Sequence, residues 1–187
     1  MRWFWIDRFE EFVSGSHAVS VKTVSLGEEP VFDYAPGSPY YPTSLIVEGL
    51  AQTGGLLVAQ PSDFKKRVVL AKITKSKFHF EAVPGDVLRF RTEVVNTQEN
   101  GGIAAGTVHV GDRLLCEADL TFAYLDDRFD GVQLFEPDTF CRTLRCLRLF
   151  DVGVDQHGKP VSIPQHMLDA EIADVERSRA RNVPAGS

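Results

Sequence analysis

The sequence has few cysteines and lacks any long apolar run. Its three cysteines, Cys116, Cys141 and Cys146, are odd in number and form no Cys-x-x-Cys pair, so neither a disulfide framework nor a zinc site is suggested. We therefore expect no metal, no cofactor and a reducing, cytoplasmic setting. Residues 1–12 mix aromatic with charged side chains, so we expect no secretion signal there. The apolar runs fall far below the ~20 residues of a membrane-spanning helix, and we expect no membrane partner.

Positive charge is also in short supply. The chain carries 20 Lys and Arg against 26 Asp and Glu, a net charge of −6, which argues against a dedicated nucleic-acid binder. Hydrophobic residues at 43% and charged residues at 25% are globular averages and exclude wholesale disorder. A length of 187 residues suits one domain with a substantial core.

One segment, residues 42–59, is apolar on every side of a helix. Its sequence, PTSLIVEGLAQTGGLLVA, would span about 27 Å as a helix. It opens with a proline, which suits a helix start, and Pro61 closes it. Gly49, Gly54 and Gly55 each cost about 1 kcal/mol of helix propensity relative to Ala, a loss that tight packing against a sheet would explain. A helix that is apolar all round is predicted to be buried on all sides.

The segments around this helix alternate apolar and polar residues with a period of two. Residues 88–94 follow a Pro-Gly-Asp turn, and residues 103–110 and 116–124 are joined across a Gly-Asp hairpin signal. Residues 19–22 and 68–80 are strand-like as well. These patterns predict an antiparallel meander with one apolar face. A sheet wrapped around the helix buries both, so we expect the α+β hot-dog fold.

The pattern changes after residue 126. An Asp-rich connector precedes an apolar stripe of Phe140, Leu144 and Leu147, and a weakly amphipathic stretch follows over residues 167–181. We therefore expect two parts, a hot-dog domain over residues 1–126 and a mainly helical C-terminal extension over residues 127–187.

Glu48 and Gln52 are the largest polar residues of the apolar helix. They are four positions apart and therefore neighbours on one helix face. An ionised carboxylate buried without a partner costs several kcal/mol or shifts its pKa. Glu48 must then face a cavity, have a partner or be held neutral, which makes it a candidate functional residue. The alternative is a structural glutamate at a subunit interface.

Two motifs around the helix resemble those of the 3-hydroxyacyl-ACP dehydratases, the FabZ/FabA-like family of the hot-dog superfamily. Residues 32–52, FDYAPGSPYYPTSLIVEGLAQ, resemble the family's F-x-G-H-F-P-x-x-P-x-x-P-G followed by L-I-V-E-A-x-A-Q. Residues 75–88, KSKFHFEAVPGDVL, resemble K-x-K-F-x-x-x-V-x-P-G-D-x-L. The resemblance covers roughly residues 3–125.

This resemblance implies a hydro-lyase that converts 3-hydroxyacyl to enoyl thioesters in fatty-acid or related acyl-chain biosynthesis. The acyl group would be carried by acyl carrier protein or coenzyme A, and the protein would form a homodimer or a dimer of dimers. In the family a histidine takes the α-proton, a glutamate from the partner subunit assists loss of the 3-hydroxyl, and backbone N–H groups polarise the carbonyl. These roles fall on Tyr34 in place of the histidine, on Glu48 oriented by Gln52, and on the backbone of Thr43 and Ser44.

Tyr34 is the main departure from the family pattern. With an ordinary pKa near 10, tyrosine is a poor general base at neutral pH. Three interpretations stay open. The first is a dehydratase with an altered site, in which Glu48 is the acid/base and Tyr34 donates a hydrogen bond. The second is a hot-dog thioesterase that uses Glu48 as nucleophile or general base. The third is a non-catalytic acyl-thioester binder, or an inactive partner in a heterodimer.

A run of cations lies in residues 65–77 with no acid among them. Its members are Lys65, Lys66, Arg67, Lys72, Lys75 and Lys77. In an acidic protein such a run predicts a docking surface that steers an acidic carrier protein. The alternative is a solvated loop and strand edge.

Overall fold

The computed structural model describes residues 4–29, 31, 39–126, 129, 131 and 134–181. Within them seven strands form one sheet in the order β3-β6-β5-β4-β2-β1-β7, antiparallel except between β1 and β7. The strands are β1 (Arg8–Val13), β2 (His17–Thr23), β3 (Val68–Phe78), β4 (Val87–Gln98), β5 (Gly101–Val110), β6 (Arg113–Tyr124) and β7 (Gly153–Val154). The helices are α2 (Thr43–Ala59), the 3-10 helix η1 (Gln60–Ser62), α3 (Pro137–Cys146), α4 (Leu149–Val152) and α5 (Gln165–Arg181).

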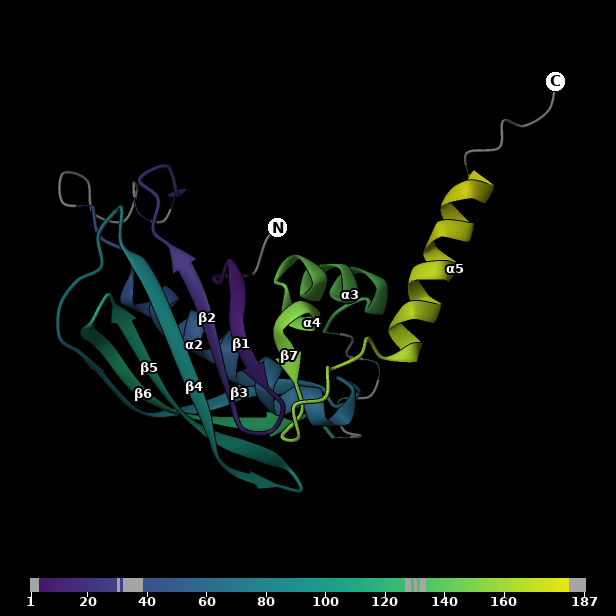
Figure 1. Cartoon of the computed structure of the whole chain (residues 1–187), viewed down its shortest axis with the longest axis horizontal. Helices are drawn as coiled ribbons and strands as arrows, with labels where there is room; N and C mark the ends of the chain where they lie inside the picture. The colour runs from purple at the N-terminus through teal and green to yellow at the C-terminus, as the bar shows by residue number, and fades with distance from the viewer. Residues whose placement is uncertain are drawn as a thin grey trace.

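The sheet curls around α2 (Figure 1). The predicted α+β arrangement, an antiparallel sheet wrapped around a long central helix, is therefore confirmed. The helix begins one residue later than predicted, at Thr43, with Pro42 as its N-cap. No helix in the described part of the chain is long and apolar enough to cross a bilayer.

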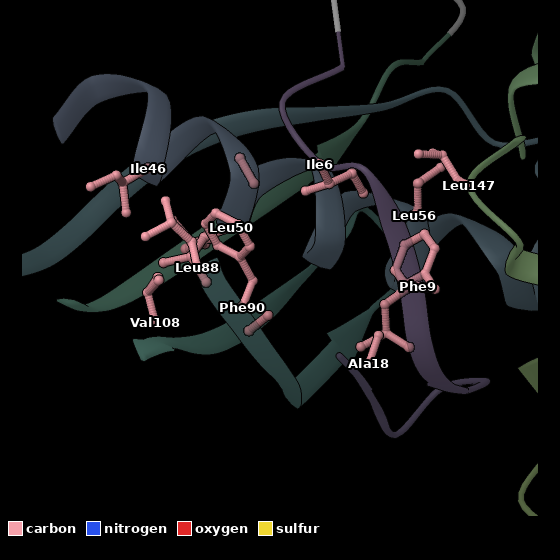
Figure 2. Close-up of a cluster of buried hydrophobic side chains, with 14 of the residues drawn as sticks. Ile6, Phe9, Ala18, Ile46, Leu50, Leu56, Leu88, Phe90, Val108 and Leu147 are labelled. Atoms are coloured by element: carbon pink, nitrogen blue, oxygen red, sulfur yellow. The ribbon is translucent and has the colours of Figure 1, made fainter. Parts of the chain in front are cut away.

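Close approach of α2 to the sheet depends on glycine. Leu50 of α2 is fully buried, and Figure 2 shows it among Leu88, Phe90 and Val108 of the strands. A Cβ added at Gly49 would lie 2.7 Å from the Phe90 ring, closer than packed atoms allow. The predicted tight packing thus holds for Gly49.

Gly55 differs from Gly49 although both belong to α2. A Cβ at Gly55 would meet the Phe122 ring at an ordinary 3.5 Å. We therefore expect Gly49→Ala to lower the free energy of unfolding by about 1–3 kcal/mol through overpacking. Gly55→Ala is expected to raise it by up to ~1 kcal/mol through helix propensity. Urea unfolding followed by circular dichroism measures both, and equal effects would contradict the close-packing argument.

Sequence reasoning missed β1. Its pairing with β2 shifts register between Phe9 and Glu11, and such a bulge breaks the period of two. As a result Phe9 and Phe12, three positions apart, are both buried in the core, and their rings meet edge to face at 5.3 Å. The expected alternation is absent because the extra residue turns both rings inward.

Of the C-terminal helices, α4 packs against β1 near the edge of the sheet, α3 packs against α4, and α5 packs against α3. The Phe9 N–H donates to the carbonyl of Leu147 at 2.7 Å, and β7 pairs in parallel with the end of β1. Leu144 and Leu147 of the predicted apolar stripe are buried and Phe140 is half-buried. α5 runs away from the body of the molecule (Figure 1). The division of the chain after residue 126 stays a prediction.

Candidate functional site

One face of α2 lines a cavity of about 840 Å³, a volume typical of small-molecule sites. The helix is buried over most of its surface, and on this face Glu48, Gln52 and Gly55 are half-buried. The α2 residues that line the cavity recur at helical spacing: Glu48, Ala51, Gln52, Gly55, Leu56 and Ala59. Glu48 therefore faces a cavity, one of the three situations that its sequence position predicted.

The Glu48 carboxylate is held by a chain of hydrogen bonds. The Gln52 Nε2 donates to Glu48 Oε1 at 3.0 Å, and the backbone N–H of Trp5 donates to Gln52 Oε1 at 2.7 Å. Because Trp5 occupies the amide oxygen, the amide NH₂ of Gln52 must point toward the carboxylate. The structure thus brings together Glu48 and Gln52, while their catalytic and orienting roles stay predictions.

Thr43 and Ser44 form the first turn of α2 and are exposed. In a helix the first N–H groups have no partner within the helix, and they carry its positive dipole end. Among the described residues, however, these two do not belong to the lining of the cavity that contains Glu48. Their predicted carbonyl-binding role stays untested, and Tyr34, predicted as catalytic, lies outside the described residues.

Burial shifts the pKa of two titratable groups of the core. Burial raises the pKa of the Tyr41 phenol, and the nearby carboxylates of Glu28 and Asp7 raise it further. Burial also raises the pKa of the Cys116 thiol to about 12. Both groups are therefore neutral at physiological pH. No cluster of three or more potential metal ligands occurs within the described ranges.

The predicted docking cations divide into two groups. Lys65, Lys66 and Arg67 line the cavity, where the Arg67 guanidinium donates to the carbonyls of Phe129 and Asp126. The other three cations lie on β3 and pair in register with polar residues of β6: Lys72 with Thr121, Lys75 with Asp119 and Lys77 with Glu117. The docking role of the six cations stays a prediction.

The C-terminal segment supplies part of the cavity wall, which sequence reasoning did not foresee. Phe135, Phe140, His166 and Met167 all line the cavity that contains Glu48. Of these, Phe140 lay in the predicted apolar stripe and Met167 at the start of the predicted amphipathic stretch. The stripe indicated that one face of α3 is covered but gave no sign of what covers it.

Comparison with protein families and curated proteins places the chain near acyl-carrier-protein dehydratases. Residues 4–119 match the model of the FabA-like domain. The chain is 41% identical over 123 residues to the 3-hydroxyacyl-[acyl-carrier-protein] dehydratase FabZ of Symbiobacterium thermophilum, a match covering 65% of this chain and 86% of the relative. It is 35% identical over 119 residues to FabZ of Enterococcus faecalis, covering 63% and 83%.

Solved structures share the fold at low sequence identity. The dehydratase heterocomplex ApeI:P of Xenorhabdus doucetiae aligns with a TM-score of 0.57 at 15% identity, over 67% of this chain and 86% of that one. A hypothetical thioesterase with coenzyme A from Streptococcus pneumoniae aligns with a TM-score of 0.52 at 16% identity, over 63% and 84%. At these identities the two structures support the fold alone.

Proposed function

This chain belongs to the FabA-like family of hot-dog proteins, and on that basis we propose that it converts 3-hydroxyacyl thioesters into enoyl thioesters. The FabZ relatives carry that activity in their names. The acyl group arrives on acyl carrier protein or coenzyme A in fatty-acid or related acyl-chain biosynthesis. The three cysteines are unpaired thiols, which supports a reducing, cytoplasmic setting.

The observation that carries this proposal is the Glu48 carboxylate, held by Gln52 on the wall of the cavity. In the elimination, Glu48 takes the proton from the carbon next to the thioester carbonyl. The C3–O bond then breaks, and the proton leaves with the hydroxyl as water. One carboxylate thus serves as both base and acid, and Tyr34 donates a hydrogen bond to the substrate.

The missing histidine supports a second function, hydrolysis of acyl thioesters. Glu48 would then activate water or attack the thioester carbonyl, and the products would be a free acid and a thiol. Mass spectrometry of reactions with 3-hydroxyacyl, enoyl and acyl thioesters distinguishes the two functions. Enoyl product from the 3-hydroxyacyl substrate supports the dehydratase, and free acid from the acyl substrate supports the thioesterase.

The exposed edge strand β3 supports a homodimer in which two sheets join edge to edge, with two dimers able to associate further. Ile73 of β3 is 44% exposed although Leu120, its neighbour in register on β6, is fully buried. A long edge strand with apolar residues on the helix side is a template for pairing with a second strand. A second copy of the chain would cover that surface and the open side of the cavity.

We expect the protein to sediment as a dimer at micromolar concentration. Ile73→Arg should raise the dimer dissociation constant at least ~100-fold, because it places an unpaired charge in the interface. Val95→Arg is the matched control, since Val95 lies on β4, away from the edge, and is 64% exposed. Analytical ultracentrifugation of the three proteins measures the effect. A wild-type monomer, or equal weakening by both variants, would contradict the interface.

A further inference from the structure

A row of aromatic rings runs along the cavity wall that faces α2. Phe4 and Phe135 lie 6.4 Å apart between ring centroids, Phe135 and Phe140 stack at 4.8 Å, and Phe140 meets Phe64 edge to face at 5.7 Å. All four line the cavity. Phe135 and Phe140 belong to the C-terminal segment, beyond the family match that ends at residue 119.

The direction of this row is fixed by its two ends. Phe4 precedes Trp5, whose N–H binds Gln52 beside Glu48. At the other end the Phe64 N–H donates to the carbonyl of Ala59, the last residue of α2. The rings therefore run alongside the second half of α2, from the level of Gln52, which holds the Glu48 carboxylate, to the end of the helix.

The α2 side of the cavity leaves room for a narrow ligand. Between Glu48 and Ala59 its lining consists of the small residues Ala51 and Gly55 and the larger Gln52 and Leu56. Glu48 and Ala59 are about 16 Å apart along the helix axis at ~1.5 Å per residue. With carbon–carbon bonds of ~1.5 Å at tetrahedral angles, that length corresponds to about a dozen bonds of an extended chain. A ligand with its reacting end at Glu48 would place its tail between the small residues and the rings.

We propose that Phe135 and Phe140 form one side of an acyl-chain channel and supply apolar contact to the part of the chain that lies beyond the thioester. The ligand class is an unbranched, apolar acyl chain of about a dozen carbons. This inference rests on the proposed function for the position of the thioester at Glu48. It adds a role for the C-terminal segment, namely tighter binding of chains that are long enough to reach its two rings.

The test is calorimetric titration of the full-length protein with pantetheine thioethers that carry saturated alkyl chains of increasing length. These probes cannot be hydrolysed or dehydrated, so binding is measured apart from turnover. Each added methylene should tighten wild-type binding about fourfold until the chain fills the channel, after which the gain stops. In Phe140→Ala and Phe135→Ala the gain per methylene should be smaller for chains long enough to reach the missing ring, while the shortest chains should bind as they do to the wild type.

Two features keep the test decisive. Phe135 is 49% exposed, so its truncation costs little folding stability and can be measured where Phe140→Ala fails to fold. Phe150 packs against the core but does not line the cavity, so Phe150→Ala is the matched control and should keep the wild-type length profile. A profile that is the same in wild type and in all three variants would overturn the channel while leaving the proposed function standing. No binding of any thioether by the wild type would overturn the proposed function and the channel together.

Discussion

Replacing Glu48 by glutamine is expected to lower kcat/KM for a 3-hydroxyacyl thioester by ~10²-fold or more, with the fold and the dimer intact. The amide oxygen of the new glutamine can still accept the hydrogen bond that Gln52 donates to Glu48 at 3.0 Å. The geometry of the site is therefore kept, but an amide cannot take up and return a proton. Loss of a general acid/base typically costs 10²–10⁴-fold.

Gln52→Leu separates positioning from proton transfer at the same site. Leucine has a similar volume but cannot hold the carboxylate or accept from the Trp5 N–H. We expect a smaller loss than in Glu48→Gln, about tenfold, with kcat reduced and KM nearly unchanged, because the carboxylate remains but is misplaced in part of the molecules. Steady-state kinetics measures kcat and KM of both variants. Circular dichroism and sedimentation are the controls for an intact fold and dimer. Full turnover by a folded Glu48→Gln dimer would make Glu48 a structural residue.

The Glu48–Gln52 pair was predictable because helix geometry alone places residues four apart on one face. The group that binds Gln52 on its other side, the backbone N–H of Trp5, was not predictable. The backbone of Trp5 is 47 positions from Gln52 in sequence, and a backbone N–H leaves no trace in residue type. The sequence therefore indicated which side chain needed a partner but not the group that fixes the orientation of Gln52.

The fold, like the site, was predictable only where a local sequence pattern reports it. The alternation of residues 88–94 and 116–124 predicted β4 and β6, because each has one face on the core. β1 was not predicted, because its bulge brings Phe9 and Phe12 to the same side of the sheet and so breaks the alternation. The stripe of Phe140, Leu144 and Leu147 predicted a covered face of α3, but the tertiary contact that places Phe140 on the cavity wall has no local sequence signal.

Replacing Tyr34 by histidine is expected to raise dehydration of a 3-hydroxyacyl thioester by about 10²-fold or more. The resemblance places Tyr34 at the family's base, and an imidazole with an ordinary pKa near 6.5 accepts a proton at neutral pH far better than a phenol with a pKa near 10. The gain requires neutral imidazole. It should therefore be small at about pH 5 and rise with pH through ~6.5.

Tyr34→Asn is the control for this gain, because asparagine is similar in size to histidine but cannot act as a base. A gain in both variants would point to relief of steric blockage by the tyrosine rather than to proton abstraction.

If Tyr34→His produces no enoyl product while the wild type releases free acid from acyl thioesters, the protein is a thioesterase that uses Glu48. If neither protein turns over any thioester, yet both bind the alkyl thioethers, the site has kept the ligand pocket of its family without the chemistry. Glu48 then serves to hold the N-terminal segment to α2 through Gln52.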